Sequence, residues 1–311
     1  MDEMPRLAAF PKGFFDAIVE RRMSVFAWIE IAGDLELDGA ELYPRFLEAL
    51  DGRYLAKLRA AATTRGLELP MMCHSPDFTQ PDGDARRREI VRTRDMLKVT
   101  AELGGRYCRV LSGQNRPGLD EAEALTWVIE ALWELEPHAQ EQGVLMCLEN
   151  HYKDGLWEYP EFAQSHRRYL AILDAVDSSW LRAQYDPSNA IVAGEDPYEL
   201  LATVLPRIAT VQASDRYLEH GTIDDLRRLD RDPQQGYASY VKHGDIGHGL
   251  NDYDRILSTL ARAGYSGWIS IEDGEGPTVE IGTENLRQSA RFLREGIERH
   301  FKETNGDART D

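Results

Sequence analysis

Short apolar runs alternate with longer amphipathic stretches along the whole chain. This alternation predicts repeated strand–helix units around a parallel sheet, because a buried parallel strand is short and apolar while the helix that follows it has one polar face. The predicted strands are Leu7–Phe14, Gly39–Tyr43, Leu67–Asp77, Tyr107–Ser112, Val144–His151, Leu181–Asp186, Ile208–Asp215 and Trp268–Asp273.

Glycines and acidic residues mark the ends of the predicted helices. The helix at Arg53–Arg65 ends at Gly66, and the helix at Ala85–Leu103 ends at Gly104, as expected where a chain leaves a helix through a left-handed residue. A third helix begins near Asp120 with acidic residues in its first turn, which complement the helix dipole.

The number of strand–helix units favours a closed barrel over an open sheet. A length of 311 residues allows one or two domains, but no linker divides the chain. No GxGxxG motif follows a strand, so a dinucleotide-binding sheet loses its main support. We therefore expect an α/β protein with a single (β/α)8 TIM barrel over residues 1–301.

Two segments depart from the repeating pattern. Residues 218–247 are polar and without a strong apolar period, so we expect a long excursion after the seventh strand, with a short helix at Thr222–Leu229. It could cover the barrel mouth or contact a partner. Residues 302–311 are expected to form a disordered tail.

Composition narrows the possible partners. The chain is 42% hydrophobic and 29% charged, which fits a soluble protein, and its net charge of −18 opposes nucleic acid and anionic membrane surfaces. No stretch is long enough to span a bilayer, and no signal peptide is recognisable. Cys73, Cys108 and Cys147 are widely spaced in apolar runs and read as buried thiols of a reducing compartment. We expect a cytoplasmic protein.

Polar residues gather where the predicted strands end. In a TIM barrel these ends meet at one mouth, where catalytic groups stand. Three are carboxylates that follow apolar runs, Glu149, Asp186 and Glu272. An unpaired buried carboxylate is costly, so three that converge predict a bound divalent cation, and oxygen ligands favour a hard ion such as Mn²⁺ or Mg²⁺. The competing interpretation is that each caps a helix, as Asp186 could do ahead of Pro187.

Two histidines also lie at strand ends. His151 comes two residues after Glu149 and therefore points to the same side of an extended strand, where it could act as a base beside the metal. His74 could contact substrate at the mouth. A surface position for His151 and a capping role for His74 are the alternatives. His248, between two glycines, reads as structural.

Six motifs carry a resemblance to a known family: CHSP, CLENH, YDPSN, VQASDR, IGHGLNDYDRIL and GWISIED. Over nearly its whole length the chain resembles the sugar phosphate isomerase/epimerase family, the xylose-isomerase-like barrels. The resemblance implies a metal held by Glu149, Asp186, Gln212 and Glu272, with Mn²⁺ expected and Mg²⁺ or Co²⁺ as alternatives. Gln212 departs from the family pattern, which has histidine there, and an amide oxygen binds such ions more weakly than imidazole.

The stretches FPKGFFDAIVERR and ENHYKDGLWEYPEF resemble, more narrowly, the alpha subunits of C-glycoside deglycosidases. This resemblance implies action on 3-oxo-glycosides, together with a small beta subunit. His151 would then be the base of a β-elimination. The substrate contacts expected at strand ends are His74, Asn150, Asn189 and Arg216.

Two other functions stay open. A ketose or sugar-phosphate 3-epimerase or isomerase would use Glu149 and Glu272 as catalytic groups on opposite sides of the reacting carbon. A metal-free subunit that binds sugar or holds a partner is the non-enzymatic alternative, and the weakened ligand Gln212 is its best support.

Overall fold

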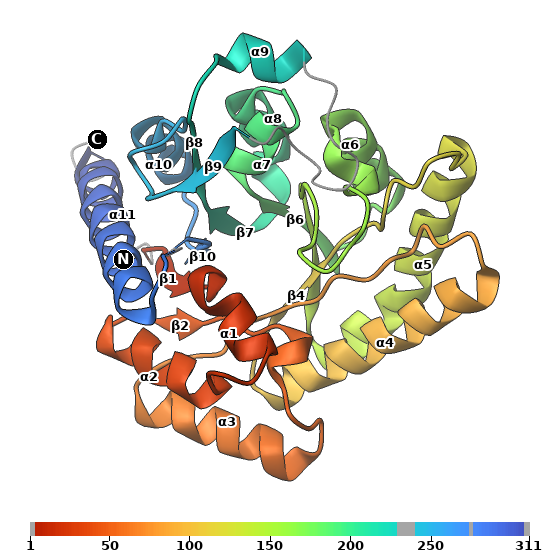
Figure 1. Cartoon of the computed structure of the whole chain (residues 1–311), viewed down its shortest axis with the longest axis horizontal. Coiled ribbons are helices and arrows are strands. Elements are labelled where there is room, and N and C mark those ends of the chain that lie inside the picture. The colour runs from red at the N-terminus through yellow and green to blue at the C-terminus, as the bar shows by residue number, and fades with distance from the viewer. Residues whose placement is uncertain (1–3, 229–239, 274–275, 308–311) are drawn as a thin grey trace.

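The computed structural model describes residues 4–228, 240–273 and 276–307 and shows a parallel barrel ringed by helices (Figure 1). Its strand order is β2-β1-β10-β7-β6-β5-β4-β3, and every neighbouring pair is parallel. The strands are β1 (Arg6–Ala9), β2 (Gly39–Ala40), β3 (Met71–Cys73), β4 (Tyr107–Val110), β5 (Leu145–Glu149), β6 (Leu181–Tyr185), β7 (Ile208–Ala213) and β10 (Trp268–Ile271). The predicted TIM barrel is confirmed.

The two ends of this strand order meet at a short seam between β2 and β3. The Ala40 amide donates to the Glu68 carbonyl over 2.9 Å, Leu42 donates to Met71 over 3.1 Å, and Cys73 donates to Leu42 over 2.7 Å. Pro70, just before β3, has no N–H to donate, which limits the length of the pairing. The barrel is thus nearly closed, and its closure rests on few bonds.

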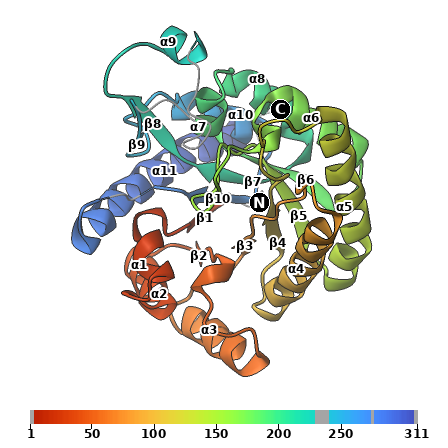
Figure 2. The same cartoon turned by 45° about the vertical axis from the view of Figure 1, so that its right-hand side comes forward.

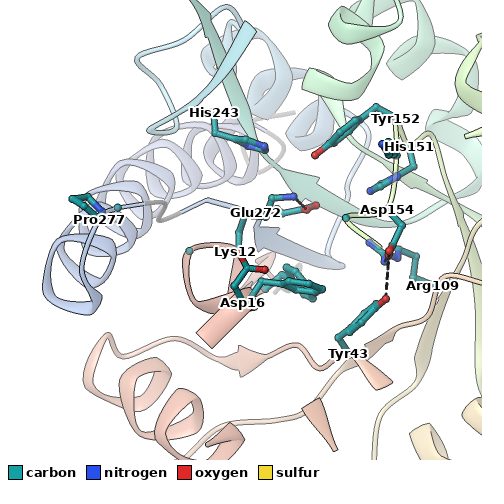
Figure 3. A pocket seen from close by; sticks show the side chains of 16 residues that line it. Lys12, Asp16, Tyr43, Arg109, His151, Tyr152, Asp154, His243, Glu272 and Pro277 are labelled. Atoms are coloured by element: carbon teal, nitrogen blue, oxygen red, sulfur yellow. Dashed lines mark hydrogen bonds and ion pairs between the residues drawn. The ribbon is translucent and has the colours of Figure 1, made fainter. Parts of the chain in front are cut away.

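Several predicted strands are longer than the observed ones. The first prediction ran to Phe14, whereas β1 ends at Ala9 and residues Lys12–Phe14 form a 3-10 helix. Pro11 explains the difference, because it cannot donate a ladder hydrogen bond and its ring fixes a turn-like backbone. Lys12 is thereby turned toward the barrel mouth (Figure 3).

The outer helices begin and end largely where the sequence predicts. Asp51, Asp82 and Asp120 each accept a backbone N–H at the start of α3, α4 and α5. Gly66 and Gly104 have positive φ after α3 and α4. The bounds are α1 (Phe15–Val19), α2 (Val25–Asp34), α3 (Gly52–Thr64), α4 (Gly83–Glu102), α5 (Glu121–Gln142), α6 (His166–Ala175), α7 (Pro187–Val192), α8 (Pro197–Val204), α10 (Tyr253–Arg262) and α11 (Val279–Asp307).

The excursion after β7 begins with a strand. β8 (Asp215–Leu218) pairs antiparallel with β9 (Val241–Gly244), and α9 (Ile223–Arg228) lies between them in sequence. Figure 2 shows α9 standing away from the ring of helices. The predicted helix at Thr222–Leu229 therefore exists, although its last residue, like the rest of 229–239, lies outside the described residues.

The predicted disordered tail is partly wrong, because α11 continues to Asp307. Extending an existing helix costs far less than starting one, and the buried side chains of Ile297 and Phe301 anchor the preceding turns. Lys302 also pairs with Glu298 one turn earlier, over 3.3 Å. Residues 308–311 lie outside the described residues.

The core agrees with the predicted burial of the three cysteines, which are all buried free thiols. Within the described ranges, every helix is too short or too polar to pass through a lipid bilayer.

Candidate metal centre

Three buried carboxylates meet at the mouth of the barrel. Glu149 ends β5, Asp186 follows β6 and Glu272 follows β10, so the parallel sheet delivers all three to the same end. Each is at most 5% exposed, and one carboxylate oxygen from each lies within 4.8 Å of the other two. The structure therefore brings together the three acids that the sequence singles out.

Burial and mutual repulsion act on these acids. Burial raises the pKa of Glu149 well above its usual value, and burial together with Glu272 raises the pKa of Asp186 to about 6. Burial also opposes ionisation of Glu272, but the nearby charges of Lys12 and Arg109 outweigh it and hold the Glu272 pKa below its usual value. A divalent cation among the three would favour their ionised forms.

Lys12 and Arg109 also belong to the candidate site, and the sequence analysis did not single them out. The Lys12 ammonium lies 3.1 Å from Glu272 Oε1, and Arg109 Nη1 lies 3.2 Å from Glu149 Oε2. Arg109 also donates to Ser75 Oγ over 2.7 Å. Arg109 had a detectable signal, since a charge inside an apolar strand needs a partner. For Lys12, the only signal in the sequence was its position near the end of the first predicted strand.

Gln212 lies on β7, and its amide is fixed by Glu41, the residue directly after β2. Its Nε2 donates to Glu41 Oε2 over 3.0 Å, while Oε1 is buried and has no hydrogen-bond partner among the described residues. Glu272 Oε2 is a second such acceptor. Buried oxygens without donors are unfavourable unless a cation compensates them, so the donor set fits a metal ion.

Asp186 both caps a helix and belongs to the acidic cluster. It caps α7 by accepting the Asn189 N–H over 2.9 Å, and it accepts from Ser188 Oγ over 3.2 Å. Ser214 Oγ lies 2.8 Å from both of its carboxylate oxygens. These hydrogen bonds fix the orientation of the carboxylate without removing it from the acidic cluster.

His151 stands beside the acidic cluster in the wall of a cavity. It is 3% exposed, its ring stacks on Tyr152 at 5.1 Å, and Nδ1 has no hydrogen-bond partner among the described residues. Burial, followed by the positive charge of Arg109, holds the pKa of His151 well below its usual value. The imidazole is therefore neutral near pH 7.

The four predicted substrate contacts, His74, Asn150, Asn189 and Arg216, are not among the residues that line the cavity. The Asn150 side chain bridges to the Asp186 backbone over 2.7 Å, and Asn189 Nδ2 lies 3.3 Å from Glu149 Oε1. His74 is buried against Thr93, and burial lowers its pKa to about 3. Arg216 stacks on Tyr152 and hydrogen-bonds with His243. Their side chains hold the strand ends in place.

The cavity has a volume of about 710 Å³, which suits a small ligand (Figure 3). Its aromatic lining residues are Phe10, Phe15, Tyr43 and Tyr152, and Figure 3 shows Tyr43 and Tyr152 at opposite edges of the cavity. The charged and imidazole side chains that line it are Lys12, Asp16, Arg109, His151, Lys153, Asp154, His243 and Glu272. This mixture suits a ligand with both hydroxyl groups and flat apolar faces.

Residues 29–296 match the family model described as the xylose isomerase-like TIM barrel. The chain belongs to this family. Among curated proteins, it is 23% identical over 309 residues to inosose dehydratase of Bacillus thuringiensis (strain Al Hakam), covering 94% of this chain and 93% of the relative.

Two solved structures with the same fold are similarly distant in sequence. The IolI protein with a bound zinc atom has a TM-score of 0.73 and 17% identity, covering 95% of this chain and 99% of that one. The 3-keto-D-glucoside 4-epimerase YcjR from E. coli has a TM-score of 0.65 and 17% identity, covering 94% and 99%. At these identities the structures show a shared fold.

Proposed function

We propose that the protein is a metal-dependent sugar enzyme that removes a proton next to a carbonyl, and that it is the catalytic alpha subunit of a C-glycoside deglycosidase. One observation carries the proposal: a neutral, buried histidine, His151, lines a cavity together with Glu272, one of three clustered carboxylates. A base beside a candidate cation site is the arrangement that such proton abstraction requires.

Glu149, Asp186 and Glu272 would hold the ion, and Gln212 Oε1 would be the fourth ligand. Oxygen donors favour a hard divalent ion, and Mn²⁺ is our choice over Mg²⁺ or Co²⁺. When bound, the ion supplies positive charge that polarises the substrate carbonyl. Lys12, beside Glu272, adds a second positive charge on the cavity side.

The proposed reaction is β-elimination from a 3-oxo-glycoside. His151 takes the proton on carbon 2, and the electron pair of that C–H bond forms the double bond to carbon 1. The bond between carbon 1 and the aglycone breaks, and the aglycone leaves with its electron pair and takes up a proton. The products are an unsaturated keto sugar and the free aglycone.

The relatives support this reaction class. The inosose dehydratase is named for the removal of water, which is also an elimination, and the E. coli structure is named for action on a 3-keto-glucoside. Epimerisation is the alternative, since it begins with the same proton removal and the same structure is named an epimerase. The pairing of Glu149 with Arg109 and of Glu272 with Lys12 favours elimination, because it ties up the carboxylates that an epimerase would use.

The first test measures metal content. Glu149→Ala, Asp186→Ala and Glu272→Ala should each lose the ion, because two carboxylates and an amide bind far more weakly than three carboxylates and an amide. Elemental analysis after dialysis against Mn²⁺ gives the stoichiometry. If Glu149→Ala and Glu272→Ala both kept a full equivalent of metal, the proposed centre would be wrong, and a metal-free binding subunit would be favoured.

The second test separates elimination from epimerisation. His151→Ala should abolish cleavage of a 3-oxo-glycoside, by at least about 100-fold, while metal content stays at one equivalent. Products are followed by chromatography, with simple ketoses as parallel substrates and with and without a candidate small beta subunit.

His248→Ala is the matched control for this test, since His248 is an exposed histidine outside the cavity lining. It should change neither cleavage nor metal content. Near-normal cleavage by His151→Ala would remove that residue from the mechanism.

A further inference from the structure

Glu41 is a buried acid below the cavity that the proposed reaction does not use. It follows β2, is 1% exposed and does not line the cavity. Its Oε2 accepts from Gln212 Nε2 over 3.0 Å and from Cys73 Sγ over 3.3 Å. An acid buried this deeply is costly, so its partners indicate what it does.

The hydrogen bond with Glu41 fixes the orientation of the Gln212 amide. Glu41 Oε2 accepts a hydrogen bond from Cys73, so it acts as an acceptor. A second hydrogen bond to it must come from a donor, and in the Gln212 amide the donor is the NH₂ group and not the oxygen. Gln212 Oε1 must therefore point away from Glu41, and it is the buried acceptor without a partner among the described residues.

The strand register places Gln212 next to the proposed ligands. Val211 pairs with Tyr185 on β6, so Gln212 is level with Asp186, the next residue on that side. Gln212 itself pairs with Ser270 on β10, and Glu272 lies two residues further along, with its side chain on the same face. By register, Gln212 is level with Asp186, and Glu149 and Glu272 lie one side-chain layer before and after it.

We propose that Glu41 is a positioning residue that orients Gln212 so that the metal centre presents only oxygen atoms to its ion. The inference rests on the proposed metal centre and extends it to metal choice. Carboxylate and carbonyl oxygens suit Mn²⁺ and Mg²⁺, whereas imidazole suits Zn²⁺. With Glu41 holding the amide, this centre favours Zn²⁺ less than a centre with an imidazole ligand in the place of Gln212 would.

A double-mutant cycle on Mn²⁺ affinity tests whether Glu41 acts through Gln212. Titration calorimetry gives the dissociation constant for the wild-type protein, Glu41→Leu, Gln212→Ala and the double variant. Glu41→Leu should weaken binding by about 10–100-fold, as expected when a residue that orients a ligand is lost. The double variant should bind no more weakly than Gln212→Ala alone, because no amide remains to orient.

Controls separate positioning from general damage to the core. Glu41→Gln keeps an acceptor oxygen and should retain most of the affinity, and Cys73→Ala removes another partner of Glu41 without touching Gln212. Glu41→Ala is measured beside Glu41→Leu, so that the result does not depend on the packing of one side chain. Gln212→His should shift the preference from Mn²⁺ toward Zn²⁺ by at least about tenfold.

The outcomes distinguish a failure of the positioning role of Glu41 from a failure of the proposed metal centre. Unchanged Mn²⁺ affinity in Gln212→Ala would remove Gln212 from the metal centre. If Gln212→Ala binds weakly but both Glu41→Leu and Glu41→Ala bind as the wild type does, the positioning role is overturned. It is also overturned if the two losses multiply in the double variant, since Glu41 would then act independently of Gln212.

Discussion

Two cations share the barrel mouth with the acids, and they differ in how freely they meet solvent. Arg109 is almost completely buried, with a 4% exposed side chain, and also bonds Ser75. The side chain of Lys12 is 19% exposed and lines the cavity. Arg109 therefore belongs to the framework of the site, whereas Lys12 is placed to meet a ligand.

Replacing Lys12 should affect metal and substrate in opposite directions. Lys12→Met removes a positive charge beside Glu272, so Mn²⁺ should bind about three- to tenfold more tightly, a change of about 1 kcal/mol. Turnover should fall, because the cavity loses the ammonium. Calorimetry and cleavage rates measure the two effects, with exposed Lys57→Met on α3 as the control. Weaker Mn²⁺ binding would show that Lys12 supports the centre.

A site residue could be predicted from the sequence when its position at the end of its own strand was enough to identify it. Glu149, Asp186 and Glu272 each follow an apolar run, and that is visible in sequence. Glu41 could not be predicted in this way, because its role depends on Cys73 on β3 and Gln212 on β7. The same limit applies to Arg216, which contacts Tyr152 and His243 and does not itself line the cavity, because sequence position does not give these partners.

The loop after β5 carries His151 and is fastened to the loop after β4. Glu161, at its far end, accepts from the backbone N–H of Ser112 over 2.7 Å and from the Ser112 hydroxyl. Gln114 Oε1 accepts from the backbone N–H groups of Glu158 and Tyr159 over 2.9 and 3.0 Å. Burial raises the pKa of Glu161 to about 8.

The raised pKa of Glu161 predicts a loss of stability at high pH. The folded state holds the Glu161 proton more tightly than the unfolded state, where the pKa is near 4.5. Stability from this group is fully present below that value and is lost as pH rises through about 8. Glu161→Gln stays neutral, so its free energy of unfolding should fall less between about pH 5 and pH 9, by an amount on the order of a few kcal/mol.

Urea unfolding at the two pH values measures this effect. Glu158→Gln, an exposed change in the same loop, should keep the pH dependence of the wild-type protein. An identical pH dependence in Glu161→Gln and the wild type would mean that the acid is ionised in the fold at neutral pH.

The ends of helices could be predicted where the residue at the end itself carries the signal. Gly66 and Gly104 end helices because of their own backbone freedom, and Asp51 begins one through its own side chain. The pairing of β8 with β9 was not predicted, because Asp215–Leu218 finds its partner across more than twenty intervening residues. Its polar sequence shows no alternation that would reveal the pairing.

At the scale of the whole molecule, the eight units predict a closed barrel but not where closure is weakest. That place is the seam between β2 and β3, which also carries Glu41. Mn²⁺ bound through Gln212 should stabilise the seam, since a ligand stabilises the elements that must be in place for it to bind. Hydrogen exchange at the amides of Ala40, Leu42 and Cys73 should therefore slow by about tenfold or more when Mn²⁺ is added.

The α5 helix provides an internal comparison for that measurement, because it contributes no proposed ligand. Exchange there should change little. Equal slowing in α5 and at the seam would indicate that the ion stabilises the fold as a whole, without a particular effect on the closure.

The pairing of β1 with β10 determines when the site can exist during synthesis. Arg6 is in register with Trp268, so the first strand meets its partner only after roughly 260 further residues have been made. At about 5–20 residues per second, the ribosome needs tens of seconds for that length. Glu272 follows β10 directly. The nascent chain must therefore keep one edge of β1 uncovered until β10 has been made, and it acquires its full set of acids only at that point.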